Sequence, residues 1–304
     1  MKKIDLSEDN IQKFKDMYYD GVSFKEIREC FNISNTTIDR WKKKYGIISN
    51  RNKYTLNSTD ETKQKMEKIF MPQKYIPLID DYNGNHKKYI FNESYFDLID
   101  HQDKAYMIGL FLADGCIVND NSAFTISLQI KDESILKSIK EKLEYTGNLH
   151  YIPLSQKNSN WQDQCKLYIY SKHMCRALNF YGIVPNKSLI LEFPKNLERQ
   201  YYKHLLRGYI DGDGNISKNT REREVRFVST KEFCYSAKLL IENILNINCM
   251  VRKCKKNSTV YELSVIGGRQ ATIFLNWIYT DANLYLQRKY DIYKSIYINN
   301  SLSA

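Results

Sequence analysis

Two stretches decide the fold of this chain: Tyr106-Met-Ile-Gly-Leu-Phe-Leu-Ala-Asp-Gly115 and Leu205-Leu-Arg-Gly-Tyr-Ile-Asp-Gly-Asp-Gly214, which lie 99 residues apart. Each is an apolar run of helical character that carries a glycine and, four positions later, a second small residue, as in Gly109 and Ala113. Each run ends in Asp-Gly. A pattern repeated at this period predicts two similar folding units in one chain. We call the two runs the signature helices.

Small residues predict that the signature helices pack against each other. Gly208 and Gly212, like Gly109 and Ala113, are four positions apart and therefore share one helical face. A glycine inside a helix costs roughly 1 kcal/mol relative to alanine, so a close approach of two backbones is a reason for its presence. The two helices are therefore expected to lie side by side.

The acids that end the two helices, Asp114 and Asp213, would then meet at one end of the helix pair. A helix C-terminus disfavours an anion, and two neighbouring carboxylates repel each other. A divalent cation removes both problems, and oxygen ligands favour Mg²⁺. Acids paired around a metal ion suit phosphodiester hydrolysis. The alternative is that each Asp-Gly is only a turn after a helix, with glycine supplying a left-handed conformation.

Composition favours an intracellular protein with a polyanionic partner. The chain has 304 residues, enough for two or three domains, a net charge of +11 and a pI near 9.1. General enrichment in Lys, Asn, Ile and Tyr is the alternative explanation of the charge. Seven cysteines without a CxxC pair predict neither a disulfide framework nor a zinc site. Apolar stretches are too short to span a membrane, and the N-terminus lacks the apolar core of a signal peptide, so no membrane partner is expected.

The first 50 residues predict a small all-α domain of three short helices over 7–45, with a turn at 32–34. A short helix, a tight turn and a second helix resemble the helix-turn-helix of resolvase-type and phage DNA-binding domains. The residues expected to point outward for base contacts are Asn35, Thr36, Thr37, Asp39 and Arg40. Six basic residues without an intervening acid suit phosphate contacts: Arg40, Lys42, Lys43, Lys44, Arg51 and Lys53. The alternative is a small helical bundle with a solvated basic face.

The remaining chain divides into a linker over 51–96 and two units over 97–196 and 197–304, the second including a C-terminal helix. Periodicity predicts the order α-β-β-α-β-β-α in each unit, if a short strand around Ile117 and Ile216 follows each Asp-Gly. In the first unit the later elements are expected at 123–130, 132–143, 148–154, 165–170 and 172–181. In the second unit the elements are expected at 198–210, 224–229, 231–245, 248–253, 259–265, 269–279 and 284–298.

These residues resemble the LAGLIDADG homing endonucleases over roughly 90–298. Arg207-Gly-Tyr-Ile-Asp-Gly-Asp-Gly214 is a close match to the family motif, whereas Gly109-Leu-Phe-Leu-Ala-Asp-Gly115 has Leu112 in place of the first acid. The resemblance implies an α+β fold in which two αββαββα units form a pseudo-twofold saddle on the DNA major groove. It also implies a monomer that acts as a pseudo-dimer, binds double-stranded DNA and cuts both strands. Asp114 and Asp213 would be the metal-binding acids, with Mg²⁺ as the cofactor and Mn²⁺ as a substitute.

The family also places a basic residue late in each repeat, near the scissile phosphates. Lys187 lies 73 residues after Asp114, and Lys289 lies 76 after Asp213. These similar offsets make the two lysines candidates for stabilising the transition state or positioning water, with Arg288 as a substitute for Lys289. Lys131 and Lys231 form a weaker pair of the same kind. For any single lysine, a solvated surface charge is the alternative.

Base recognition is expected from outward-facing strand residues, because Gln and Arg form bidentate hydrogen bonds with adenine and guanine edges. The candidates, together with the lysines that follow the strands, are Ser127, Gln129, Lys131, Arg223, Arg226, Ser229 and Lys231.

The sequence therefore predicts a site-specific, Mg²⁺-dependent DNA endonuclease from a mobile element, intron or phage. Met1 in place of a nucleophilic Cys or Ser, and an end at Ser301-Leu-Ser-Ala304 without His-Asn, favour a freestanding or intron-borne protein over an intein. Two alternatives remain: a DNA-binding regulator on a scaffold that has lost nuclease activity, and an RNA-splicing maturase. The second motif, around Asp213, is the nearer to the family consensus.

Overall fold

The structure is a computed structural model that describes residues 8–19, 24–45, 66, 68–76, 89–118, 120–219, 223–254 and 259–298. The chain divides into two compact units, Met1–Glu61 and Thr62–Ala304. Within the described residues, no helix combines the length and the apolar character needed to cross a membrane.

The described residues of the smaller unit form three helices: α1 (Glu8–Tyr19), α2 (Phe24–Phe31) and α3 (Asn35–Lys44). Among the described side chains, Phe14, Ile27, Ile38 and Trp41 form a buried core. Trp41 packs edge-on against Phe14, with ring centroids 5.3 Å apart. The helix α3 begins after Ser34, whose hydroxyl accepts a hydrogen bond from the backbone N–H of Thr37. The predicted helices and turn are therefore confirmed within the described residues.

The larger unit contains the predicted order of elements twice. The first repeat consists of α6 (Gln102–Asp114), β1 (Gly115–Ile117), β2 (Ala123–Gln129), α7 (Glu133–Lys142), β3 (His150–Ile152), β4 (Gln164–Tyr170) and α8 (Lys172–Phe180). The second consists of α9 (Tyr202–Asp213), β5 (Gly214–Ile216), β6 (Glu224–Ser229), α10 (Lys231–Leu245), β7 (Met250–Lys253), β8 (Tyr261–Ile266) and α11 (Gly268–Tyr279). The α12 helix (Gln287–Ile292) follows and continues into a π-helix, Tyr293–Ile298.

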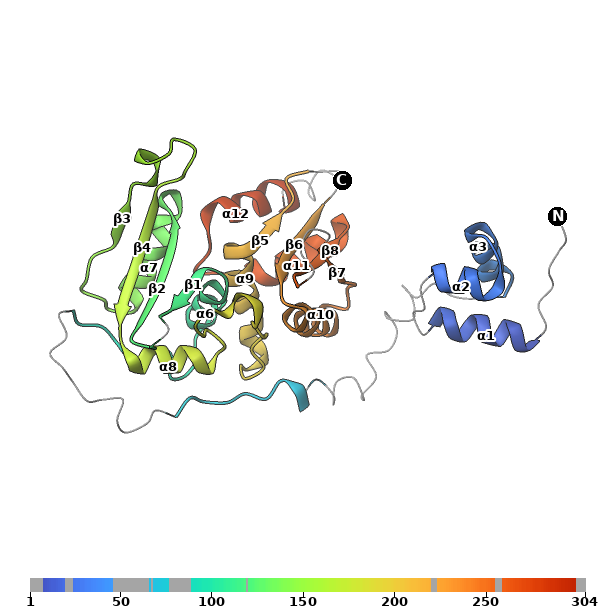
Figure 1. The fold of residues 1–304 in the computed structure, drawn as a ribbon, viewed down its shortest axis with the longest axis horizontal. Helices are drawn as coiled ribbons and strands as arrows, with labels where there is room; N and C mark the ends of the chain where they lie inside the picture. The colour runs from blue at the N-terminus through green and yellow to red at the C-terminus, as the bar shows by residue number, and fades with distance from the viewer. Residues whose placement is uncertain are drawn as a thin grey trace. The chain divides into compact units, whose positions relative to one another are not determined.

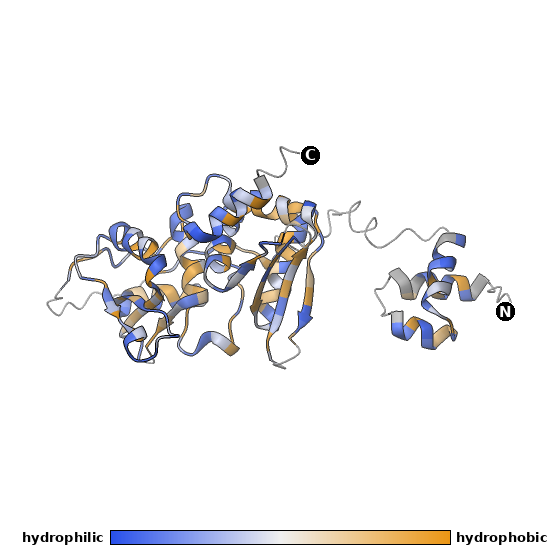
Figure 2. Cartoon of the chain, turned by 90° about the horizontal axis from the view of Figure 1, so that it is seen from above, coloured by the Kyte–Doolittle hydropathy of each residue, from blue (hydrophilic) through white to orange (hydrophobic). Residues whose placement is uncertain are grey.

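Each repeat forms one antiparallel four-stranded sheet, with strand orders β1-β2-β4-β3 and β5-β6-β8-β7. The α6 and α9 helices lie between the two sheets (Figure 1). One face of each sheet is buried against helices, because apolar residues alternate along the strands, as do Phe124, Ile126 and Leu128 in β2. Figure 2 shows hydrophobic and hydrophilic residues interspersed along the helices and strands. The predicted α+β fold with two matched units is confirmed.

Glycines bring the backbones of α6 and α9 into direct contact. A methyl group built on Gly109 would lie 1.9 Å from the Leu205 carbonyl oxygen, and one on Gly208 would lie 2.0 Å from that of Tyr106. Two helices approach this closely only where side chains are absent at the crossing. The prediction that the signature helices pack side by side is confirmed.

Several predicted elements differ at their ends. The strand expected to reach Ile130 stops at Gln129, and Ile130 begins a 3-10 turn with 47% of its surface exposed. The helix expected from Glu198 begins with a separate 3-10 turn, Arg199–Tyr201, and α9 then runs on to Asp213. At the first of these ends, the apolar alternation of β2 continues into Ile130, past the last residue paired with β4, Gln129.

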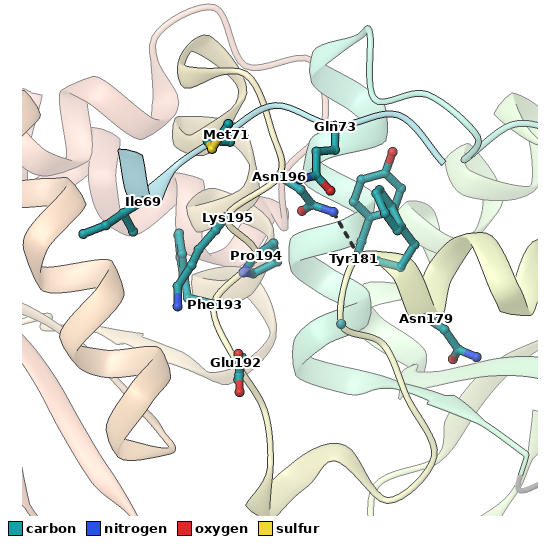
Figure 3. A pocket seen from close by; sticks show the side chains of 12 residues that line it. Ile69, Met71, Gln73, Asn179, Tyr181, Glu192, Phe193, Pro194, Lys195 and Asn196 are labelled. Carbon is teal, nitrogen blue, oxygen red and sulfur yellow. Dashed lines mark hydrogen bonds between the residues drawn. The ribbon is translucent and has the colours of Figure 1, made fainter. Parts of the chain in front are cut away.

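Part of the predicted linker packs onto the larger unit. Phe70 lies edge-on to Phe193 and Tyr202, and the Gln73 N–H donates to the Asn196 carbonyl. Figure 3 shows Gln73 and Asn196 beside a pocket of about 380 Å³ that this segment helps to line. Phe96, further along, is fully buried against the first repeat. Residues 68–76 and 89–96 therefore belong to the fold of the larger unit, whereas 51–65, 67 and 77–88 lie outside the described residues.

Candidate active site

Asp114 and Asp213 are the last residues of α6 and α9, as the sequence predicts. The glycine after each acid has an extended backbone, with φ of −76° at Gly115 and −83° at Gly214, and begins a strand. The alternative explanation, a turn in which glycine is left-handed, therefore does not apply. A methyl group built on Gly212 would lie 2.7 Å from Oδ2 of Asp114, so the Asp114 carboxylate rests against the backbone just before Asp213. The helix packing thus brings an acid from each repeat together.

The electrostatics of the two acids reflect this proximity. Burial, and then the charge of Asp213, raise the pKa of Asp114 from 3.8 to about 6, against the opposing effect of nearby Lys289, Lys187 and Arg288. Loss of hydration also raises the pKa of Asp213, although this residue keeps more contact with solvent than Asp114. Both carboxylates are therefore costly to ionise without a cation beside them.

Lys187 and Lys289 occupy matching places under the two helix ends. Both side chains are buried. The Lys187 Nζ donates to the carbonyls of Ala113, at 3.3 Å, and Gly115, at 2.5 Å. The Lys289 Nζ donates to Asp211 and Gly214, each at 2.7 Å, and to Ile210.

A solvated surface position is thus excluded for both lysines. Burial lowers the pKa of Lys289 to about 8 and also lowers that of Lys187, while the charges of nearby aspartates oppose both shifts. Each lysine donates hydrogen bonds to carbonyls at a helix C-terminus, where its positive charge offsets the negative end of the helix dipole. Each also lies close to the paired acids. All three Lys289 protons have carbonyl acceptors, so its positive charge acts on the acids through space.

Asp211, the first acid of the second motif, has a structural role. It is fully buried, and its carboxylate accepts hydrogen bonds from the hydroxyls of Tyr106 and Tyr279 and from the N–H of Leu286. Leu286 directly precedes α12, so Asp211 fixes the start of the helix that carries Lys289. The role was not predictable, because these partners lie 68 to 105 residues away along the chain.

The first repeat has a different arrangement at the matching position. Leu112 is buried, with its side chain 3.7 Å from a methyl group built on Gly182. An apolar contact there replaces the three hydrogen bonds of Asp211. The two halves of the site are therefore supported differently, even though both end in Asp-Gly.

A cationic pocket of about 680 Å³ adjoins the end of α9 and draws residues from both repeats. Among the described residues, its charged lining consists of Lys131, Lys218, Arg226, Arg288 and Lys289, with Glu224 as the one acid. Arg288 also forms an ion pair with Asp132 at 3.0 Å, which joins α12 to the first repeat. Lys131 was predicted as a weaker candidate, and the structure places it here with Arg288. The excess of positive charge suits a polyanion.

Comparison with known proteins decides the family. The family described as "LAGLIDADG-like domain" matches residues 101–179 and 200–279, together more than half of the chain. The chain belongs to this family. Each matched segment begins at or near a signature helix and ends in the last helix of its repeat, so the family pattern coincides with the two folding units.

Individual relatives are more distant. The chain is 30% identical over 130 residues to DNA-directed RNA polymerase subunit Rpo1C of Methanocaldococcus jannaschii, a match that spans 43% of this chain and only 14% of that protein. Similar solved structures include the I-LtrWI LAGLIDADG homing endonuclease bound to target DNA, with 15% identity, 68% of this chain and 90% of that chain covered, and a TM-score of 0.41. Another is DUF199/WhiA from Thermatoga maritima, with 12% identity, 70% and 69% covered, and a TM-score of 0.43.

The outer faces of the two sheets carry some of the predicted DNA-binding residues. Ser127 and Gln129 in β2 and Arg226 in β6 alternate with buried residues and point away from the helices. Lys231, at the start of α10, is exposed. These positions agree with the outward orientation that the sequence predicts.

Two residues differ from that expectation: Ser229 at the end of β6 and Arg223, which directly precedes β6. Ser229 faces the helices, where its hydroxyl is 3.0 Å from the Tyr209 hydroxyl. Arg223 turns toward the C-terminal segment, with its guanidinium 5.7 Å from the centre of the Tyr297 ring. The predicted outward orientation was wrong for both, because strand residues three positions apart point to opposite faces and Arg226 already occupies the outer one.

The candidate residues of the smaller unit lie on or near α3. Asn35, Thr36 and Arg40 are exposed and Thr37 is half-buried. The Thr36 and Thr37 hydroxyls lie 2.8 and 3.0 Å from that of Ser34, so the cap of α3 engages both. Lys42 is half-buried and pairs with Asp39 at 3.4 Å. The side chain of Lys43, with Arg51 and Lys53, lies outside the described residues.

The paired acids suit Mg²⁺ as a ligand set. No group of three or more His, Cys, Asp and Glu side chains suited to a metal occurs in the described part of the chain. Asp114 and Asp213 would therefore supply two carboxylates, with the remaining positions left to water and a phosphate. Mg²⁺ characteristically binds in this way, through one or two carboxylates plus substrate oxygens. The raised pKa values of both acids agree with a place that a cation would stabilise.

Proposed function

We propose that this chain is a site-specific DNA endonuclease that hydrolyses phosphodiester bonds with Mg²⁺, for which Mn²⁺ can substitute. The meeting of Asp114 and Asp213 beside a cationic pocket carries the proposal. Membership of the LAGLIDADG-like family and the DNA-bound state of I-LtrWI support it. Action as a monomer follows from the two repeats in one chain, and an origin in a mobile element, intron or phage belongs to the same proposal.

In this mechanism Asp114 and Asp213 would hold the cation through their carboxylates. Bound Mg²⁺ would activate water and stabilise the leaving oxygen. Lys187 and Lys289 hold the two helix ends through carbonyl hydrogen bonds and offset the repulsion between the acids. Lys187 has two carbonyl acceptors, so its third proton is available to a phosphate or water.

The smaller unit is proposed to act as a helix-turn-helix that adds DNA affinity or sequence preference. The helix α3 follows a three-residue turn and exposes Asn35, Thr36 and Arg40 together. A recognition helix presents its N-terminal residues to base edges in this manner. Lys42 and Lys43 are proposed to contact phosphates of the same duplex.

The test is cleavage of a plasmid library, seeded from the gene's own genomic neighbourhood, with Mg²⁺ and with EDTA. The proposal expects double-strand cuts at one sequence with Mg²⁺ and none with EDTA. DNA binding without cleavage at any sequence would favour the regulator. Binding only to structured RNA would favour the maturase. Affinity for DNA should fall steeply with salt, because many phosphates are neutralised.

A further inference from the structure

The outer face of the second sheet carries a cluster of charged side chains around Glu262. The Glu262 Oε1 accepts from Arg252, at 2.8 Å from Nε and 2.6 Å from Nη2, and from the Ser264 hydroxyl at 3.1 Å. Its Oε2 lies 4.0 Å from Arg226 Nη1, and that arginine also pairs with Glu224 at 3.3 Å. The Glu262 carboxylate on β8 thus lies between two arginines, one on each of the strands, β6 and β7, that flank β8.

The register of the strands fixes this cluster on the side away from the core. Arg252 of β7 lies directly opposite Glu262 of β8, and Arg226 of β6 lies opposite Ser264. The neighbouring positions Phe227, Leu263 and Val265 are buried on the other face. The two arginine side chains are 42% and 53% exposed, whereas Glu262 is only 13% exposed. The arginines are therefore available to a ligand, and the acid lies beneath them.

The near-zero net charge of the cluster favours an uncharged part of the DNA as its ligand over a phosphate. Its two arginines are balanced by Glu224 and Glu262, and a carboxylate repels a DNA phosphate. The edge of a base carries no net charge. An arginine held in one plane can donate two hydrogen bonds to O6 and N7 of guanine, the commonest specific contact in the major groove.

The first sheet provides the contrast. The strand residues that the structure describes on its outer face include Lys166, beside Ser127 and His150 in register, and no carboxylate. The Lys166 ammonium lies 5.4 Å from the centre of the Tyr168 ring, without an acid in that row. A cation without a neighbouring carboxylate suits a phosphate. The two sheets thus present different chemistry to DNA.

We propose that Arg226 and Arg252 read guanines in one half of the DNA target, and that Glu262 is the positioning residue that fixes both guanidinium planes. This proposal rests on the proposed function, since it requires sequence-specific duplex binding. It adds Arg252 and Glu262 to the residues that determine specificity and makes the two half-targets unlike in composition. Lys166 contributes affinity without sequence preference.

The experiment is selection of bound duplexes from a randomised pool by the full-length protein in EDTA, which removes any need for cleavage. Wild type is compared with Arg252→Ala, Arg226→Ala and Glu262→Gln. Lys253→Ala is the matched control, because Lys253 follows Arg252 on the same strand and points to the other face. Lys166→Ala is the phosphate-contact comparison. Melting temperatures verify that each variant is folded.

Arg252→Ala and Arg226→Ala should each reduce a guanine preference at one base pair by about 5- to 150-fold, the range for a bidentate base contact. Both should leave the salt dependence of binding unchanged. Glu262→Gln should weaken the same two preferences while binding persists. Lys166→Ala should lower affinity for all sequences alike and reduce the salt slope by about 1. Lys253→Ala should match wild type.

Three outcomes would overturn the proposal. If Arg252→Ala lowers affinity equally for all duplexes and reduces the salt slope, the arginine contacts phosphate. If Glu262→Gln leaves the guanine preferences of wild type intact, the acid has no positioning role. If wild type selects a consensus that neither arginine variant alters, other residues read the bases. The absence of any consensus in wild type is a separate result, which would refute site-specific binding itself.

Discussion

A single methyl group at the crossing of α6 and α9 should disturb both stability and chemistry. In Gly208→Ala the new carbon would lie 2.0 Å from the Tyr106 carbonyl oxygen, and non-bonded atoms rest at about 3.5 Å. The helices would therefore have to separate by roughly 1.5 Å. A backbone oxygen cannot rotate away as a side chain can, so the cost belongs at the upper end of overpacking, about 3 kcal/mol.

Alanine also improves helix propensity by about 1 kcal/mol, which leaves a net destabilisation of about 2 kcal/mol. For a unit of this size that lowers the melting temperature by about 4 to 8 °C. Separation of the helices also moves Asp114 away from Asp213. A misplacement of about 1 Å costs on the order of 100-fold in rate, so the folded variant should cut DNA about 100-fold more slowly.

Calorimetry of the full-length protein and single-turnover cleavage below the melting temperature measure the two effects separately. Gly268→Ala is the control, because its new methyl group would meet only the flexible side chain of Arg223, at 3.3 Å. That variant should melt and cut like wild type. If Gly208→Ala melts within 1 °C of wild type and cuts at the same rate, the helix crossing does not set the geometry of the site.

Three further predictions concern other parts of the molecule. Asp211→Leu removes the acceptor of three buried donors and should destabilise the larger unit by about 3 to 5 kcal/mol in urea unfolding, whereas Leu112→Met, at the matching position, should cost under about 1.5 kcal/mol; equal effects would refute the anchoring role. The pKa of Asp114 is about 6 in the fold against 3.8 ordinarily, so the folded state binds the proton more tightly and the metal-free protein gains stability as pH falls from 7 towards 4. Asp114→Asn should lose that gain in melting experiments, and Mg²⁺ should stabilise wild type more at pH 7.5 than at pH 5.5; a pH profile unchanged by the substitution contradicts this. Trp41→Ala, which removes a buried core side chain of the smaller unit, should unfold that unit alone and weaken DNA binding, while the transition of the larger unit stays at its wild-type temperature.

Local patterns were sufficient to predict most of the fold. The period of 3.6 in α3 and the alternation in β2 and β6 gave their boundaries to within a residue or two, since each depends on neighbours in sequence. The repetition of the signature helix, with its small residues, was sufficient to predict that the two copies pack against each other. The packing of Phe70 and Phe96 onto the larger unit was missed, because an irregular segment leaves no periodic signal.

The candidate site was predictable only in part. The pairing of Asp114 with Asp213 followed from the small residues beside them, and the structure brings the two together. By contrast, the hydrogen bonds of Lys187 and Lys289 to helix-end carbonyls were not predicted, and the place of these lysines beside phosphates stays a prediction. Such contacts depend on how the chain returns to the helix ends more than 70 residues later, which no local pattern records.

The most direct test of the composite acid site is a comparison of wild type with Asp213→Asn on the cleaved sequence. Binding is measured in EDTA and strand cleavage in Mg²⁺. The variant should bind this duplex about as tightly as wild type, because Asp213 is proposed to hold the cation and not to read a base, and it should cut neither strand. Double-strand cutting by Asp213→Asn at the wild-type rate would contradict this prediction.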